Sequence, residues 1–191
     1  MANNATQKKK TAYINFFGQI NPQSTAHLMS VIQQKLKDGV ERFVILISSG
    51  GGQVRSGISA YNFLKGIPAE VITHNYGDVS SVAIVLFCAG SKRMCVPNAR
   101  FLLHGIVLNV EKTRFNEKSL TERLKGLKID RENIAKVIAA NSDKTEEEVD
   151  EDMLEGITLN PHEAIEYGLV HDIKPELIEK GAELITIAGG T

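Results

Sequence analysis

The sequence predicts an α/β layered fold, and two observations support this class. Continuous apolar runs, such as residues 42–48, are typical of strands buried on both faces of a parallel sheet. Segments with apolar residues at helical spacing lie between these runs, so expected strands and helices alternate. The 191 residues, of which 42% are hydrophobic and 24% charged, are enough to enclose a core in one domain.

The first elements follow from local signals. A strand is expected at residues 11–17, and the break at Asn21-Pro22 precedes a helix expected at residues 24–37. Asp38-Gly39 ends this helix, and the buried strand at residues 42–48 follows. The inward face of the helix carries apolar residues at helical spacing: Leu28, Val31, Ile32 and Leu36.

The middle of the chain continues the alternation. The glycine turn Gly50-Gly51-Gly52 leads into a helix expected at residues 53–65, and a strand is expected at residues 70–74. A helix headed by Ser80 and Ser81 should follow and end at residue 89. Two further short strands are expected, at residues 93–96 and 101–104.

The second half of the chain is charged and mainly helical. A long helix is expected at residues 114–140, with one narrow apolar stripe that suits either a solvated surface helix or an arm that pairs with a neighbouring subunit. A capping box at residues 145–148 opens a short acidic helix. Asn160-Pro161-His162-Glu163 begins another helix, which ends at Gly168. These starts are encoded locally, by side chains that satisfy free backbone amides.

The composition narrows the classes of function. A net charge of −1 implies no bulk attraction to nucleic acid or to an anionic membrane. The apolar run at residues 82–89 is too short to cross a bilayer, and the polar, basic opening is not a secretory signal, so the cytoplasm is the expected compartment. Cys88 and Cys95 lie in apolar segments without metal-ligand spacing, and we expect buried, reduced thiols and no metal site.

Three features together have the chemistry of a serine acyl-transfer site. Ser81 precedes an apolar run, His104 closes another, and the glycine turn can expose backbone amides. A serine hydroxyl needs a base to take its proton, and the developing oxyanion needs donors. Each feature also has an ordinary explanation, because serines cap helices, histidines fill cores and glycines make turns.

The ordered set of motifs resembles the Clp protease proteolytic subunit (ClpP) family over roughly residues 12–173. No single motif is specific to this family, but the whole set in this order and at these intervals is. The motifs that carry the resemblance are Ser49-Gly50-Gly51-Gly52, Gly77-x-x-x-Ser81, Ala89-Gly90, Pro97-Asn98-Ala99-Arg100, Leu102-Leu103-His104 and Glu163-Ala164-x-Glu166-Tyr167-Gly168-Leu169-Val170.

The resemblance implies a serine endopeptidase that cuts unfolded proteins or peptides without a cofactor or metal. Ser81 matches the family nucleophile and His104 its general base, while the amides of Gly52 and Val82 match the oxyanion donors. The implied fold is of the ClpP/crotonase type, a repeated β-β-α head with a projecting helical handle. The implied partners are other copies of the chain in a homo-oligomeric ring and a separate AAA+ unfoldase that uses ATP.

On this basis we expect three regions along the chain. Residues 1–10 form a disordered N-terminus, residues 11–175 form a single ClpP-like domain and residues 176–191 form a C-terminal tail. The handle is expected at about residues 106–140. The sequence departs from the family at Gly50, where the family has proline, and after His104, where Gly105-Ile106 replaces Gln-Pro, so the handle geometry is in question.

The largest departure concerns the acid of the triad, whose position falls on Gly156. Glu155 could orient His104 after a one-residue shift. Alternatively a Ser-His pair could act alone, with a backbone or amide group such as that of Asn160 holding the imidazole, or the chain could be a weak or inactive ring subunit. A fourth possibility is an acyl-CoA-processing enzyme of the crotonase type, which uses a similar glycine-turn oxyanion hole.

Overall fold

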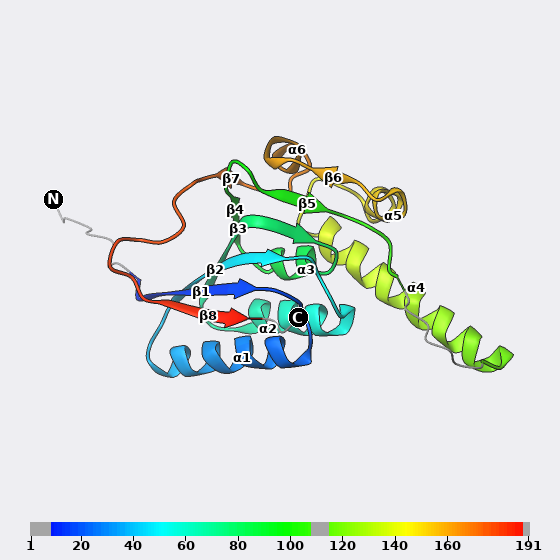
Figure 1. Cartoon of the computed structure of the whole chain (residues 1–191), viewed down its shortest axis with the longest axis horizontal. Coiled ribbons are helices and arrows are strands. Elements are labelled where there is room, and N and C mark those ends of the chain that lie inside the picture. The colour runs from blue at the N-terminus through cyan, green and yellow to red at the C-terminus, as the bar shows by residue number, and fades with distance from the viewer. Residues whose placement is uncertain (1–8, 108–114, 189–191) are drawn as a thin grey trace.

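The computed structural model describes residues 9–107 and 115–188 of the chain. Its centre is a sheet in the order β6-β5-β3-β2-β1-β8, with β4 and β7 pairing beside this path (Figure 1). All pairs are parallel except β5–β6. The strands are β1 (Thr11–Phe17), β2 (Arg42–Ser49), β3 (Glu70–Ser80), β4 (Lys92–Cys95), β5 (Arg100–Leu102), β6 (Thr158–Leu159), β7 (Asp172–Ile173) and β8 (Leu184–Ala188).

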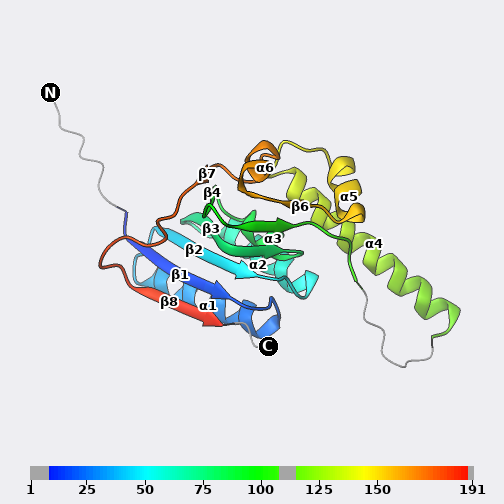
Figure 2. The ribbon, with the colours of Figure 1, turned by 45° about the horizontal axis from the view of Figure 1, so that its top comes forward.

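Helices α1, α2 and α3 cover one face of this sheet (Figures 1 and 2). Asn21, Thr145 and Asn160 each accept the backbone amide of the third helical residue, which completes a capping box at the start of α1, α5 and α6. The helices are α1 (Pro22–Lys37), α2 (Val54–Gly66), α3 (Ala83–Phe87), α4 (Glu117–Ala139), α5 (Glu146–Glu155) and α6 (Pro161–Glu166). The predicted α/β class is confirmed.

The central strand β2 is buried on both faces, as its continuous apolar run predicts. Phe43, Ile45 and Ile47 point into the main core beneath the helices. Val44 and Leu46 point the other way, into a smaller apolar cluster. Part of the cover over that second face comes from the C-terminal segment, which packs Leu177 and Ala182 against the cluster.

The prediction of a C-terminal tail outside the domain needs correction. β8 pairs in parallel with β1, from Tyr13 opposite Leu184 to Phe17 opposite Ala188. The chain from β7 to β8 runs round the end of the sheet where β1 and β2 begin (Figures 1 and 2). The domain therefore extends to residue 188, because the edge of β1 supplies hydrogen-bond partners that no local signal reveals. The predicted disorder of residues 1–10 lies outside the described residues at positions 1–8. It is wrong for the last two, because Lys9 pairs with Glu70 at 2.8 Å and the Lys10 carbonyl accepts from the amides of Glu41 and Arg42.

The strand that contains the serine pair is longer than predicted. β3 does not stop at His74, because its first half pairs with β4 and its last residues, Asp78 to Ser80, pair with β5. Ser80 is thus the last residue of a strand and Ser81 lies in a turn, and α3 begins only at Ala83. The expected helix headed by serines is corrected to a strand-turn-helix junction.

The long helix α4 projects from the head (Figures 1 and 2). Its C-terminal third packs into the core through Ile134 and Ile138, whereas Leu120, Leu124 and Ile129 nearer its start are exposed. A projecting helix with exposed apolar side chains agrees with the predicted arm. Residues 108–114, within the handle expected at about 106–140, lie outside the described residues.

Removal of the Ile187 side chain tests whether β8 is part of the packed sheet. Ile187 is fully buried in the main core, so Ile187→Ala should lower the free energy of unfolding by about 2–5 kcal/mol. Leu184 on the same strand is 39% exposed, and Leu184→Ala should cost clearly less. Urea unfolding at one protein concentration measures both, and equal small losses would contradict the placement of β8.

Candidate active site

Ser81 occupies a sharp turn at the carboxyl end of β3. Its backbone has a φ of 57°, in the left-handed region that non-glycine residues seldom adopt. The Ser81 amide donates to the carbonyl of Leu102 at 2.8 Å, and the Ser81 carbonyl accepts from Ile84 at 3.0 Å. Such conformations cost energy and concentrate at functional sites, where the surrounding structure holds them.

The glycine turn after β2 lies directly beside Ser81. A Cβ atom on Gly51 would lie 2.7 Å from the Cβ of Ser81, closer than real side chains approach. A Cβ on Gly52 would collide with the carbonyl of Ile20. Glycine is required at both positions because the backbone passes so close to its neighbours.

The backbone bonds of this turn orient the Gly52 amide. Ile20 donates to the carbonyl of Gly51 and accepts from the amide of Gln53, each at 2.8 Å. Successive amides of an extended chain point to opposite sides, so the amide of Gly52 points away from Ile20. Gly52 lines the same cavity as Ser81, which makes this amide available to a bound group.

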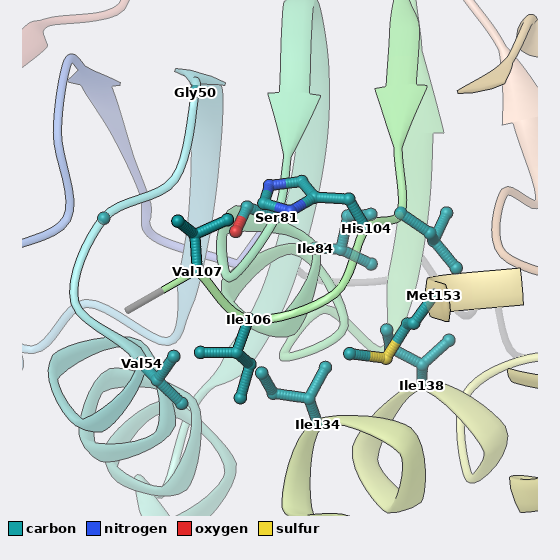
Figure 3. A pocket seen from close by; sticks show the side chains of 12 residues that line it. Gly50, Val54, Ser81, Ile84, His104, Ile106, Val107, Ile134, Ile138 and Met153 are labelled. Carbon is teal, nitrogen blue, oxygen red and sulfur yellow. The ribbon is translucent and has the colours of Figure 1, made fainter. Parts of the chain in front are cut away.

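His104 follows β5 at the same edge of the sheet. Its imidazole extends toward the Ser81 side chain in Figure 3. The Nδ1 atom lies 2.6 Å from the carbonyl oxygen of the next residue, Gly105. The structure therefore brings together the predicted pair, Ser81 and His104, and leaves Nε2 as the other polar atom of the ring.

Ser81 and His104 stand beside a cavity of about 230 Å³ (Figure 3). α4 and α5 both contribute to its wall, so the base of the projecting helix is part of the site. Apart from the two polar side chains, the wall consists of glycines and apolar residues. The apolar residues are Val54, Ile84, Leu103, Ile106, Val107, Ile134, Ile138 and Met153.

The polar side chains of α5 and at the start of α6, which include the predicted partners Glu155 and Asn160, are exposed or make other hydrogen bonds. Glu155 is exposed at the end of α5, and the Asn160 side chain caps α6. Asp152 accepts a 2.7 Å hydrogen bond from the Tyr167 hydroxyl. Burial, together with this bond, raises the pKa of Tyr167, which keeps the hydroxyl protonated as the donor. The partner on Nδ1 is the Gly105 carbonyl, which agrees with the alternative that a backbone group holds the imidazole. The sequence did not identify Gly105, because a backbone acceptor leaves no residue signature.

The two cysteines are buried, as expected, and carry no reactive character. Burial raises the pKa of Cys88 to about 12 and that of Cys95 to about 11, so both remain thiols at neutral pH. Within residues 9–107 and 115–188, no group of three His, Cys, Asp or Glu side chains is arranged to hold a metal ion. None of the helices in the described part of the chain has the length and apolar character needed to cross a membrane.

Comparison with known proteins places this geometry in a family. A model of the Clp protease family matches residues 3–176. The chain is 31% identical over 175 residues to the chloroplastic ATP-dependent Clp protease proteolytic subunit 3 of Arabidopsis thaliana, covering 86% of this chain and 55% of that protein. It is 29% identical over 150 residues to the ATP-dependent Clp protease proteolytic subunit of Paracoccus denitrificans, covering 78% and 72%.

A solved structure supports the same assignment. A mutant of ClpP1 from Listeria monocytogenes superposes with a TM-score of 0.76 at 25% identity, covering 87% of this chain and 92% of that one. The predicted ClpP-type fold is thereby confirmed. The chain spans about half the length of the Arabidopsis relative. The family match over nearly the whole chain and the shared fold show that this chain belongs to the Clp protease family, whose members are serine-type endopeptidases.

Proposed function

We propose that this chain is a Clp-like serine endopeptidase that hydrolyses peptide bonds of unfolded proteins or peptides. The observation that carries the proposal is Ser81, held at a φ of 57° at the end of β3 and facing His104 at the cavity (Figure 3). Family membership supports the reaction class, and this geometry supports the assignment of roles to residues.

Ser81 is the proposed nucleophile and His104 the proposed base. The Oγ atom attacks the scissile carbonyl carbon while its proton moves to Nε2 of His104. A C–O bond forms, and the carbonyl π pair moves onto the oxygen to give a tetrahedral oxyanion. When the C–N bond breaks, the amine leaves with the proton from Nε2. Water then attacks the acyl carbon while its proton moves to Nε2. The bond from that carbon to Oγ breaks, Oγ takes the proton from Nε2, and the peptide leaves with a new carboxyl group.

The proposed oxyanion donors are the backbone amides of Gly52 and Val82. The Gly52 amide points away from Ile20, and Val82 follows the nucleophile at the start of α3. Amides before the first turn of a helix lack partners within the helix, so they remain available to an anion. Removing one donor of this type from an enzyme costs about 10²–10³ in rate.

The apolar wall of the cavity favours an apolar side chain on the acyl side of the scissile bond. α2, α4 and α5 each supply an apolar side chain to it, through Val54, Ile138 and Met153. A charged side chain would lose its hydration there without gaining a partner. We therefore infer substrates with residues such as leucine or methionine before the cleaved bond.

The partners and compartment are also proposals. The exposed apolar residues on the projecting part of α4 support contact with further copies of the chain in a ring. The relatives are named as ATP-dependent Clp proteolytic subunits, which supports an AAA+ unfoldase as the source of substrate. The net charge of −1 gives no general attraction to nucleic acid, so we propose no nucleic-acid partner. We retain the cytoplasm as the proposed compartment, although the Arabidopsis relative is named chloroplastic.

A weak or inactive ring subunit is the second candidate function. The observation that favours it is the carbonyl, rather than a carboxylate, on Nδ1 of His104. Loss of the orienting carboxylate from a triad costs about 10⁴ in rate, yet catalysis from the remaining groups persists. A slow enzyme is thus the expectation, and the two candidates differ in whether Ser81 reacts at all.

Labelling with a fluorophosphonate probe tests the nucleophile. The wild-type protein should take one label per chain at Ser81, and Ser81→Ala should abolish it. Ser80→Ala is the matched control, because the Ser80 hydroxyl donates to Asp78 at 2.8 Å and Ser80 does not line the cavity. Equal labelling of wild type and Ser81→Ala, or no labelling of the wild type under conditions that label an active relative, would refute the proposal.

Two peptide substrates that differ only in the residue before the cleaved bond test the specificity. The leucine peptide should be cleaved with a kcat/KM at least about tenfold higher than the aspartate peptide, because the apolar cavity leaves a carboxylate unpaired. As the control, leucine is exchanged for aspartate three residues further from the cleaved bond, and this exchange should change kcat/KM less. An aspartate peptide cleaved as fast as the leucine peptide would show that the side chain does not enter this cavity.

A further inference from the structure

We propose that the main-chain carbonyl of Gly105 is the group that positions His104 for catalysis, in the place that a carboxylate takes in a Ser-His-Asp triad. The inference deepens the proposed function and rests on the Ser81–His104 mechanism. Gly105 is a positioning residue, since its carbonyl acts through the imidazole and does not touch the reacting atoms.

The contact determines which ring nitrogen carries the proton. The Nδ1 atom and the Gly105 oxygen are 2.6 Å apart. A carbonyl oxygen can only accept, so the proton of neutral His104 is on Nδ1 and the lone pair is on Nε2. This tautomer is the one that takes a proton from a serine hydroxyl. The bond also restricts rotation of the ring.

The register of two strands explains why no side chain takes this role. β5 and β6 pair with Phe101 opposite Leu159 and Leu102 opposite Thr158, and the Leu103 amide donates to the Ile157 carbonyl at 3.0 Å. The residue that this register would place opposite His104 is Gly156, which ends α5 in a left-handed conformation with a φ of 79°. A Cβ atom built on Gly156 meets nothing within 4 Å. The residue in register with the histidine thus carries no side chain, and the space around it is open.

The neighbouring polar groups are committed elsewhere. Asp152 accepts from Tyr167, and Asn160 accepts two amides at the start of α6. Glu155 is the residue before Gly156, and its side chain is exposed. The Gly105 carbonyl is adjacent in sequence to the ring that it contacts, so its position depends only on the backbone leaving β5.

A carbonyl and a carboxylate have different consequences for the reaction. Both enforce the same tautomer, but a carbonyl presents only a dipole where a carboxylate presents a full negative charge to the protonated ring. The imidazolium that forms when Ser81 attacks is therefore stabilised less. An asparagine substituted for the acid of a triad leaves the wrong tautomer and costs about 10⁴ in rate, so a carbonyl should retain more activity than that.

The tautomer is the first measurement, and it is independent of activity. Nitrogen-15 NMR of the histidine rings in the full-length protein, with His104→Gln to identify the His104 signals, reports which nitrogen is protonated at neutral pH. We expect a protonated Nδ1 and an unprotonated Nε2. A signal showing the proton on Nε2 would overturn the proposal, even if Ser81 takes the label.

The second measurement weakens the Gly105 carbonyl as an acceptor, with a control for the N–H that the same change removes. Replacing the amide between Gly105 and Ile106 by an ester makes the Gly105 oxygen a poorer acceptor and leaves every side chain in place. We expect the rate of Ser81 labelling to fall about fivefold to tenfold, the range of one net hydrogen bond. The ester between Ile106 and Val107 is the matched control, because it removes one amide and weakens the next carbonyl instead.

Glu155→Gln distinguishes the alternative acid. We expect this variant to keep the wild-type labelling rate and its dependence on pH, because the Glu155 carboxylate is exposed and the carbonyl occupies Nδ1. Equal rates for the two esters, or a loss in Glu155→Gln as large as that of the Gly105 ester, would overturn the role of Gly105. Failure of the wild type to label at Ser81 would instead refute the proposed function, and the tautomer would still be measurable.

Discussion

The close approach of the glycine turn after β2 to the end of β3 is the constraint on which the site depends. Side chains are excluded there, because a Cβ on Gly51 would overlap Ser81 and a Cβ on Gly57 would meet the side chain of Val82. The absence of side chains lets α2 and the turn pack against the start of α3. That packing holds Ser81 in a backbone conformation that it would not otherwise keep.

The parallel sheet explains why distant residues meet. The carboxyl ends of parallel strands lie at one edge, so the turn after β2, Ser81 after β3 and His104 after β5 converge although they are far apart in the chain. α4 and α5 then close the apolar side of the cavity with Ile138 and Met153. The same helix projects from the head at one end and forms part of the wall of the site at the other, so the proposed contacts between copies and the cavity wall involve one helix.

The site divides its work between side chains and backbone. Two side chains, Ser81 and His104, carry the proposed proton and acyl transfers, while backbone amides and one carbonyl supply orientation and charge stabilisation. Backbone groups are held by the fold itself, and they contribute whatever the side chain at that position. This is consistent with valine at position 82 and with glycine at positions 105 and 156, where the family's usual side chains are absent.

The sequence alone determined the features that depend on short-range physics: the buried run of β2 and the helix caps at Thr145 and Asn160. Its resemblance to the Clp protease family predicted Ser81 and His104 as the reactive pair, and the structure places both beside one cavity. Only the tertiary structure decided the features that depend on a distant neighbour. β8 forms a strand because the edge of β1 offers it hydrogen-bond partners. β3 extends to Ser80 because β5 pairs with its last residues. The acceptor on Nδ1 belongs to the same group, since it depends on the path that the backbone takes after β5.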